Sequence, residues 1–203
     1  MKPILAVTLA FVSAITSSWV FAAEGDPERG KAKSAPCAAC HAADGNSANP
    51  IWPKIAGQHA NYLAKQLSDF QAGDRQNDLM AGMVAGLSEQ DMKDLAAFYA
   101  EQELKIGESK GNNLKLGEQI YRSGNAESGV AACASCHGPK GLGNPPAGFP
   151  RISGQHAPYT VNTLKAFAKN ERANDRAAMM RDLAARMTDK EMQAVADYLA
   201  GLK

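Results

Sequence analysis

The sequence lacks several features that would let each part of it fold around an ordinary core. Beyond residue 23 no apolar run approaches the length needed to span a bilayer, and no segment shows the apolar–polar alternation of a half-buried strand. The aliphatic content is modest, and the chain divides into two halves of only about 80–95 residues. Domains this small bury a limited share of their surface and often depend on a metal, a disulfide or a cofactor.

The chain also lacks a large net charge, since its formal charge is +1 over 203 residues. Residues 24–105 contain 12 acidic and 8 basic side chains, a net of −4, whereas residues 106–203 contain 9 acidic and 13 basic ones, a net of +4. Such a dipole orients a protein toward a charged partner, although plain solvated helix faces would give the same counts. We expect no nucleic-acid partner, at most peripheral membrane association, and a monomer.

The first residues have the pattern of an export signal. Lys2 supplies the positive start, residues 4–15 form a short apolar run, and Val20-Phe21-Ala22 suits a signal peptidase. The alternative is an uncleaved N-terminal anchor. We interpret residues 1–22 as a cleavable signal peptide and expect the mature protein in a bacterial periplasm.

The rest of the chain repeats itself. CAACH at residues 37–41 recurs as CASCH at residues 133–137, and PKIAGQH at residues 53–59 recurs as PRISGQH at residues 150–156. Further matching pairs are Tyr62 and Tyr159, Arg75 and Arg172, Asn77 and Asn174, Asp78 and Asp175, and the segments 87–92 and 187–192. The repeat predicts one duplicated domain, with an N-terminal domain at residues 23–105, a linker at 106–113 and a C-terminal domain at 114–203.

Each half is predicted to be helical. Asp26 followed by Pro27 is typical of a helix start. Residues 60–72 and 157–169 have apolar residues at helical spacing. Ser88-x-x-Asp91 and Thr188-x-x-Glu191 resemble capping boxes that open a last helix in each half. The fold class is therefore all-α, with two tandem helical domains.

Cys-x-x-Cys-His is the attachment signature of c-type haem. Two thiols one helical turn apart can form thioether bonds to the two haem vinyl groups, and the following histidine is then held under the iron. The sequence predicts two covalent haem c groups, on Cys37 and Cys40 with His41, and on Cys133 and Cys136 with His137. Disulfides, a thioredoxin-like redox pair and a zinc site are the alternatives, and a four-cysteine zinc site would need both motifs to converge.

The repeat also helps to choose a sixth ligand for each iron. Met83 and Met179 have no methionine partner in the other half, and Met92 and Met192 lie on an apolar helical stripe typical of a core. His59 and His156 recur at predicted helix starts, where a capping or surface role is commoner. Met80 and Met180 recur in polar segments between helices, where a loop could cross a haem face, and we predict them as the axial ligands. A thioether favours ferrous iron and raises the reduction potential.

With both axial positions filled by protein side chains, neither iron has a site for a substrate. The sequence therefore predicts an electron carrier rather than an enzyme. The alternative is a dihaem redox enzyme, a peroxidase or a sulfur-compound oxidoreductase, which needs an open sixth position and nearby acid–base residues.

With these motifs the sequence resembles the cytochrome c4 family of dihaem class I cytochromes c, over essentially all of its mature length. The resemblance implies two cytochrome c domains whose haems lie near each other at the interface. It implies that the carbonyls of Pro53 and Pro150 accept hydrogen bonds from the two axial histidines. It also implies electron transfer in the periplasmic respiratory chain, from a quinol-oxidising complex to a terminal haem-copper oxidase.

Overall fold

The computed structural model describes residues 24–111 and 113–203, so the predicted signal peptide lies outside the described residues. The N-terminal half contains helices α1 (Pro27–Lys33), α2 (Ala35–His41), α3 (Ala60–Ala72), α4 (Asp78–Val84) and α5 (Glu89–Ala100). The C-terminal half contains α6 (Leu114–Ser123), α7 (Ala134–His137), α8 (Ala157–Ala168), the 3-10 turn η1 (Arg176–Ala178), α9 (Met179–Ala184) and α10 (Asp189–Ala200). Only two isolated β-bridges interrupt this pattern in the described parts of the chain, so the all-α prediction is confirmed.

The helix starts follow the local signals in the sequence. Asp26 caps α1 by accepting hydrogen bonds from the amides of Glu28 and Arg29. Ser88 and Thr188 each form a complete capping box with the residue three positions on. These caps satisfy amides that have no partner within a helix.

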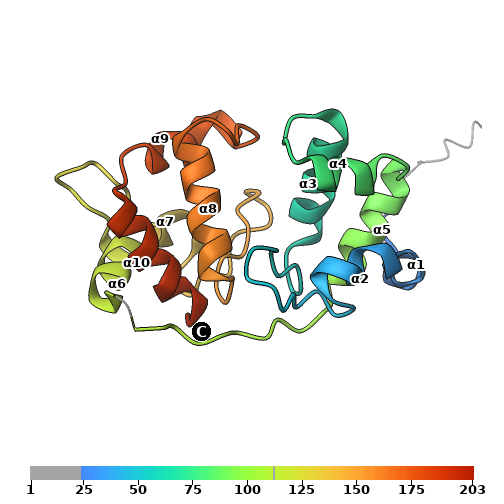
Figure 1. Cartoon of the computed structure of the whole chain (residues 1–203), viewed down its shortest axis with the longest axis horizontal. Coiled ribbons are helices and arrows are strands. Elements are labelled where there is room, and N and C mark those ends of the chain that lie inside the picture. Colours follow the sequence, from blue (N-terminus) through green and yellow to red (C-terminus); the bar gives the residue numbers. More distant parts are fainter. Residues whose placement is uncertain (1–23, 112) are drawn as a thin grey trace, which may run out of the picture.

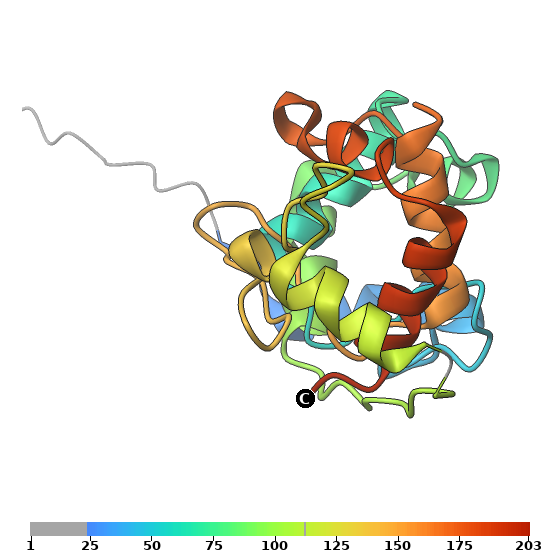
Figure 2. The same cartoon turned by 90° about the vertical axis from the view of Figure 1, so that its left-hand side faces the viewer.

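The first and last helices of each half cross at a glycine. A Cβ atom on Gly30 of α1 would lie 2.0 Å from the carbonyl oxygen of Asp94 on α5, and one on Gly117 of α6 would lie 2.2 Å from that of Ala194 on α10. Only glycine allows two helix backbones to approach this closely. In Figure 2 α6 runs across the lower side of the C-terminal half and α10 lies along its right side, and the two helices meet at the lower right.

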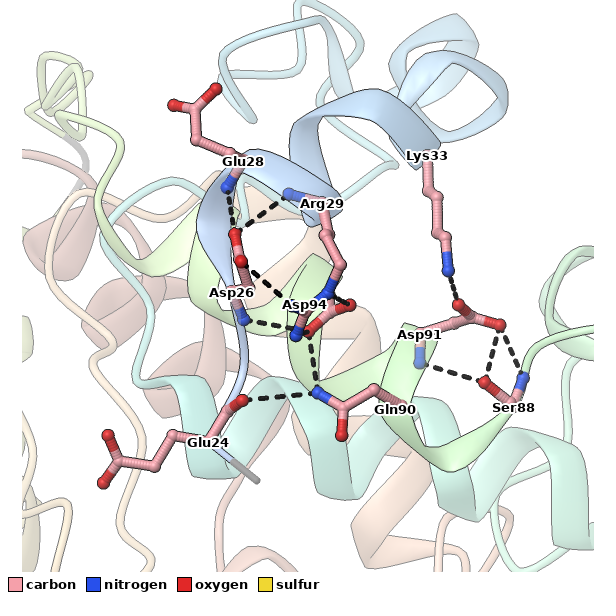
Figure 3. A network of polar contacts seen from close by, with 9 residues as sticks. All are labelled: Glu24, Asp26, Glu28, Arg29, Lys33, Ser88, Gln90, Asp91 and Asp94. Atoms are coloured by element: carbon pink, nitrogen blue, oxygen red, sulfur yellow. Dashed lines mark hydrogen bonds and ion pairs between the residues drawn. The ribbon is translucent and has the colours of Figure 1, made fainter. Parts of the chain in front are cut away.

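A polar network fastens the start of α1 to α5 (Figure 3). The buried Asp94 carboxylate accepts hydrogen bonds from the Asp26 amide at 2.8 Å and from Arg29 Nε at 2.8 Å. Gln90 bridges Asp94 and the Glu24 carbonyl, and Lys33 pairs with Asp91. The N-terminal helix is therefore held by charge as well as by packing.

The two halves lie side by side, and α3 and α8 are on the sides that face each other (Figure 1). An extended segment runs along one edge of both halves and leads from α5 to α6. This segment is anchored on α10, where Asp197 accepts hydrogen bonds from Ser109 Oγ at 2.9 Å and from the Lys110 amide at 2.7 Å. The predicted linker is thus attached to the C-terminal half.

The apolar cores are small, as the composition indicates. The N-terminal cluster consists of Leu63, Ala96, Phe98 and Tyr99. The C-terminal cluster is larger and consists of Ile120, Tyr121, Val130, Leu164, Phe167, Ala184, Met187, Met192, Val195, Leu199 and Leu202. Met92 and Met192 are 4% and 2% exposed, which confirms their prediction as core residues.

Candidate functional site: two facing haem sites

The first Cys-x-x-Cys-His motif lies within α2, and the second begins at Cys133, the N-cap of α7, and ends with that helix. No two of the four cysteines are joined in a disulfide, so the disulfide alternative is not realised. In the described residues no group of three or more histidine, cysteine or acidic side chains is placed to hold a metal ion. The two motifs therefore do not converge as a shared zinc site would require.

The two histidines of the motifs are buried and oriented in the same way. His41 Nδ1 lies 2.9 Å from the Pro53 carbonyl oxygen, and His137 Nδ1 lies 2.9 Å from that of Pro150. A carbonyl oxygen can only accept, so Nδ1 carries the proton and Nε2 keeps its lone pair. Burial lowers the pKa of both rings. Each histidine is therefore a neutral imidazole with one nitrogen free to bind iron, and the hydrogen bond implied by the resemblance is present.

Met80 and Met180 lie on short helices, so the expectation that they occupy loops is wrong. Asn77 opens α4 by accepting a hydrogen bond from the Met80 amide at 3.0 Å. Asp175 accepts from the amides of Met180 and Arg181, both at 3.0 Å. Asn77 is the N-cap of α4, whereas Asp175 lies three residues before the N-cap of α9 and satisfies two of its first-turn amides. Both polar segments therefore contain helix starts, where the sequence pattern indicated only a polar connection.

In the C-terminal half a strained turn precedes Met180. Ala177 and Ala178 have φ values of 50° and 57°, in the left-handed region that costs non-glycine residues of order 1 kcal/mol each. Met179 and Met83, the methionines without a repeat partner, are 40% and 41% exposed. Met180 is half-buried and packs against the C-terminal core.

His59 and His156 immediately precede α3 and α8, but their side chains cap neither helix. Each reaches across to the other half instead. His59 Nε2 lies 2.7 Å from the Leu142 carbonyl oxygen, and His156 Nε2 lies 2.8 Å from that of Ser47. These histidines hold the two domains together, a role that the sequence pattern did not indicate.

One cavity of about 1280 Å³ spans both halves. Pockets for drug-sized ligands are about 300–1,000 Å³, so this volume suits more than one small molecule. Its lining includes the paired attachment cysteines, the two histidines of the motifs and the predicted methionine ligands. Met92 and Met192 are not part of the lining. The space and its donors fit two large planar cofactors, one beside each Cys-x-x-Cys-His motif.

Two arginines on the cavity wall connect the halves. Arg172 is 8% exposed and donates to Tyr62 Oη at 3.0 Å and to Gln66 Oε1 at 2.9 Å. Arg75 donates to Tyr159 Oη at 3.1 Å. Within the described residues Arg172 forms no ion pair with a carboxylate, and a buried cation without an anion is costly. The carboxylate groups of a haem would supply that anion.

The wider comparisons agree with this geometry. The family model for cytochrome c matches residues 27–101 and 114–203. Cytochrome c4 of Thiocapsa roseopersicina is 50% identical over 180 residues, which cover 88% of this chain and 93% of that protein. The crystal structure of reduced recombinant cytochrome c4 from Pseudomonas stutzeri superposes with a TM-score of 0.86 at 42% identity, covering 88% of this chain and all of that one.

The chain belongs to the cytochrome c4 family. It is a dihaem electron-transfer protein whose two cytochrome c domains each carry a covalent haem c, in keeping with the cysteine spacing. A protein named thiosulfate dehydrogenase electron acceptor, from Stutzerimonas stutzeri strain A1501, is 37% identical over 82% of this chain and 78% of its own length. The name of this relative describes a protein that accepts electrons.

The sequence pattern revealed some of the site and missed other parts. The recurrence of Arg75 as Arg172 and of Tyr62 as Tyr159 was visible, but not that each arginine binds the tyrosine of the other half. The caps on the methionine helices were missed as well. In retrospect the polar residues that precede Met80 and Met180 were the available signal.

Proposed function

We propose that this cytochrome c4 carries one electron on each of two haems and catalyses no reaction of its own, with His41 and Met80 as axial ligands in one half and His137 and Met180 in the other. The observation that carries the proposal is the equivalence of the two sites. In each, a buried neutral histidine is oriented by a proline carbonyl, and a methionine on a capped helix lines the same cavity. Haem, when bound, supplies a one-electron ferric–ferrous couple.

The residues of the chain determine what that couple can do. The proline carbonyls fix each imidazole in the tautomer that leaves Nε2 free. The thioethers of Met80 and Met180 would be the second protein ligands of the two irons, which would raise their potentials and leave no site for peroxide or a sulfur compound. The buried Arg172 and the half-buried Arg75 would neutralise acidic groups of the cofactor.

The experiment replaces each axial methionine separately. We expect Met80→Ala to convert the N-terminal haem alone to a high-spin, cyanide-binding form of lower potential, and Met180→Ala to do the same for the C-terminal haem. Electron paramagnetic resonance and spectroelectrochemical titration report both changes. The matched controls are Met83→Ala and Met179→Ala, which remove an exposed neighbouring methionine on the same helix. An unchanged spectrum in Met80→Ala or Met180→Ala refutes the ligand assignment.

The setting of the proposed function is the periplasm, reached by cleavage after residue 22. No helix in the described part of the chain is long and apolar enough to cross a bilayer. We propose a monomer that accepts electrons from the quinol-oxidising complex and passes them to a terminal haem-copper oxidase. Reduction by that complex and oxidation by that oxidase, measured separately with the purified protein, test the two steps.

A second candidate function comes from the relatives. The Stutzerimonas protein named as an electron acceptor of thiosulfate dehydrogenase covers most of this chain, so the donor could instead be an enzyme that oxidises thiosulfate. Reduction of the protein by thiosulfate plus such a dehydrogenase, but not by thiosulfate alone, favours this donor. Turnover of thiosulfate or peroxide by the purified protein alone would favour a dihaem enzyme instead.

A further inference from the structure

The two Pro-x-Ile-x-Gly-Gln-His segments meet at the domain interface and exchange side chains. Gln155 Oε1 accepts from the Lys54 amide at 2.9 Å, and Gln155 Nε2 donates to the Lys54 carbonyl at 2.8 Å. In the opposite direction Gln58 Oε1 accepts from the Arg151 amide at 2.9 Å, and Gln58 Nε2 donates to the Arg151 carbonyl at 2.8 Å. Each glutamine therefore pairs with the backbone of the other domain.

The amides that these glutamines bind belong to the peptide groups that hold the axial histidines. The Pro53–Lys54 peptide accepts from His41 Nδ1 through its carbonyl oxygen and donates to Gln155 through its N–H. The Pro150–Arg151 peptide likewise connects His137 with Gln58. A continuous chain of hydrogen bonds thus runs from each histidine, through one peptide group, to a glutamine of the opposite domain.

Hydrogen bonds in such a chain polarise one another. A peptide N–H that donates makes the carbonyl of the same peptide a stronger acceptor, by about 10–30% per bond. A stronger acceptor draws the Nδ1 proton and leaves the ring richer in electrons, and outer-shell partners of this kind set the basicity of a metal-bound histidine. An electron-richer imidazole stabilises ferric over ferrous iron.

We infer that Gln155 and Gln58 are positioning residues that tune the haem of the opposite domain, Gln155 acting on the N-terminal haem and Gln58 on the C-terminal one. The inference rests on the proposed axial roles of His41 and His137. Its distinguishing feature is the crossed direction: a change in one half alters the reduction potential in the other. Gln58 is 9% exposed and Gln155 is half-buried, so solvent competes poorly for either amide contact.

The test uses the full-length dihaem protein with Gln155→Leu, which keeps the bulk of the side chain and removes both contacts with Lys54, together with the hydrogen bond that Gln155 Oε1 accepts from the His156 amide at 2.9 Å. Loss of the acceptor should weaken the His41–Pro53 hydrogen bond and raise the potential of the N-terminal haem. We expect its reduction equilibrium to shift about two- to fivefold toward the ferrous state, consistent with a modest change in one hydrogen bond. The C-terminal haem should shift less. Gln58→Leu should give the mirror-image result.

Two measurements separate tuning from a looser interface. Proton NMR of the oxidised protein should show a displaced His41 ring N–H signal in Gln155→Leu and an unchanged His137 signal. The matched control is Asn61→Ala, which removes an interdomain hydrogen bond of 2.7 Å to the Pro145 carbonyl without touching either relay peptide. It should move neither potential.

Several results would overturn the inference. In Gln155→Leu, the inference fails if the reduction potentials of both haems shift equally or if only that of the C-terminal haem shifts. It also fails if the His41 ring N–H signal does not move. Met80→Ala assigns the two titration waves and tests the proposed function separately. If Met80→Ala changes its haem while Gln155→Leu changes neither, the relay is wrong and the axial ligation stands.

Discussion

At the scale of single residues, the protein fixes its cofactor ligands by giving each one a polar partner. The axial histidines bind proline carbonyls, and the predicted methionine ligands follow side-chain caps. The histidine contacts use backbone acceptors from a neighbouring loop, whereas the methionine contacts use Asn77 and Asp175. Substitutions in these partners should therefore alter the haem sites without removing any ligand.

Asn77→Ala is the clearest substitution of this kind. The change removes the side-chain acceptor of the Met80 amide from a helix of only seven residues, and loss of such a cap costs about 1 kcal/mol. We expect a lower free energy of unfolding in denaturant titrations and easier displacement of Met80 by cyanide at the N-terminal haem. Asn77→Ser, which keeps a capping oxygen, is the control. Equal cyanide affinity in Asn77→Ala and the unmodified protein would contradict the expectation.

At the scale of elements, the first and last helices of each half depend on their glycine crossings. Gly30→Ala and Gly117→Ala place a methyl group against a backbone carbonyl of the partner helix. Because backbone cannot move aside as a side chain can, the helices must separate, at a cost of about 1–3 kcal/mol. Thermal unfolding should show a lower Tm for both variants.

The matched control for the crossings is Gly82→Ala. Gly82 lies inside α4, and a Cβ atom there has no neighbour within 4 Å. An alanine in this position should be neutral or stabilising by about 0.5–1 kcal/mol, because it restricts the unfolded chain and favours the helix. A similar decrease in Tm in all three glycine variants would show that the close approach of the helix backbones is not what makes Gly30 and Gly117 necessary.

The α1–α5 contact should also be sensitive to acid. The hydrogen bond and ion pair with Arg29 hold the pKa of the Asp94 carboxyl well below its usual range. A carboxyl with a depressed folded-state pKa contributes stability that is full above its unfolded pKa of about 3.9 and is lost as the pH falls toward the folded value. We expect Asp94→Asn to lower the Tm at pH 7, with a smaller difference near pH 3.

A series of Tm measurements between these two pH values would check this behaviour. Glu101→Gln, at an exposed position just after α5, serves as the control and should follow the unmodified protein throughout. If the Tm difference for Asp94→Asn did not change with pH, the negative charge of Asp94 would not be the source of its contribution to stability.

At the scale of the whole molecule, the two halves carry opposite formal charges, −4 over residues 24–105 and +4 over residues 106–203. A partner of either sign should therefore approach one half in preference to the other. We expect the oxidation rate of the reduced protein by an anionic small oxidant and by a cationic one to fall as salt is raised, because each is attracted to a different half. Stopped-flow measurements at low and high ionic strength test this. Rates that do not change with salt for either oxidant would favour simple solvated helix faces.

Local chemistry in the sequence was sufficient to predict most of the fold and the place of the cofactors. Haem attachment needs five consecutive residues, and helix starts at Asp26, Ser88 and Thr188 depend on side chains within three positions of one another. Interactions between residues this close in the sequence need no tertiary contact, so the local pattern of side chains predicts them. The internal repeat shows each motif twice. Because Met80 and Met180 recur and the neighbouring methionines Met83 and Met179 do not, the repeat favoured Met80 and Met180 as ligands.

Only the tertiary structure decided how the two halves work on each other. Gln155 and Lys54, or Arg172 and Tyr62, are separated by about a hundred residues and become partners only when two folded domains pack. The same is true of His59 and His156, whose place in the sequence indicated a cap or a surface and whose side chains instead join the domains. Contacts of that kind depend on the relative orientation of two surfaces, which no local pattern of side chains specifies.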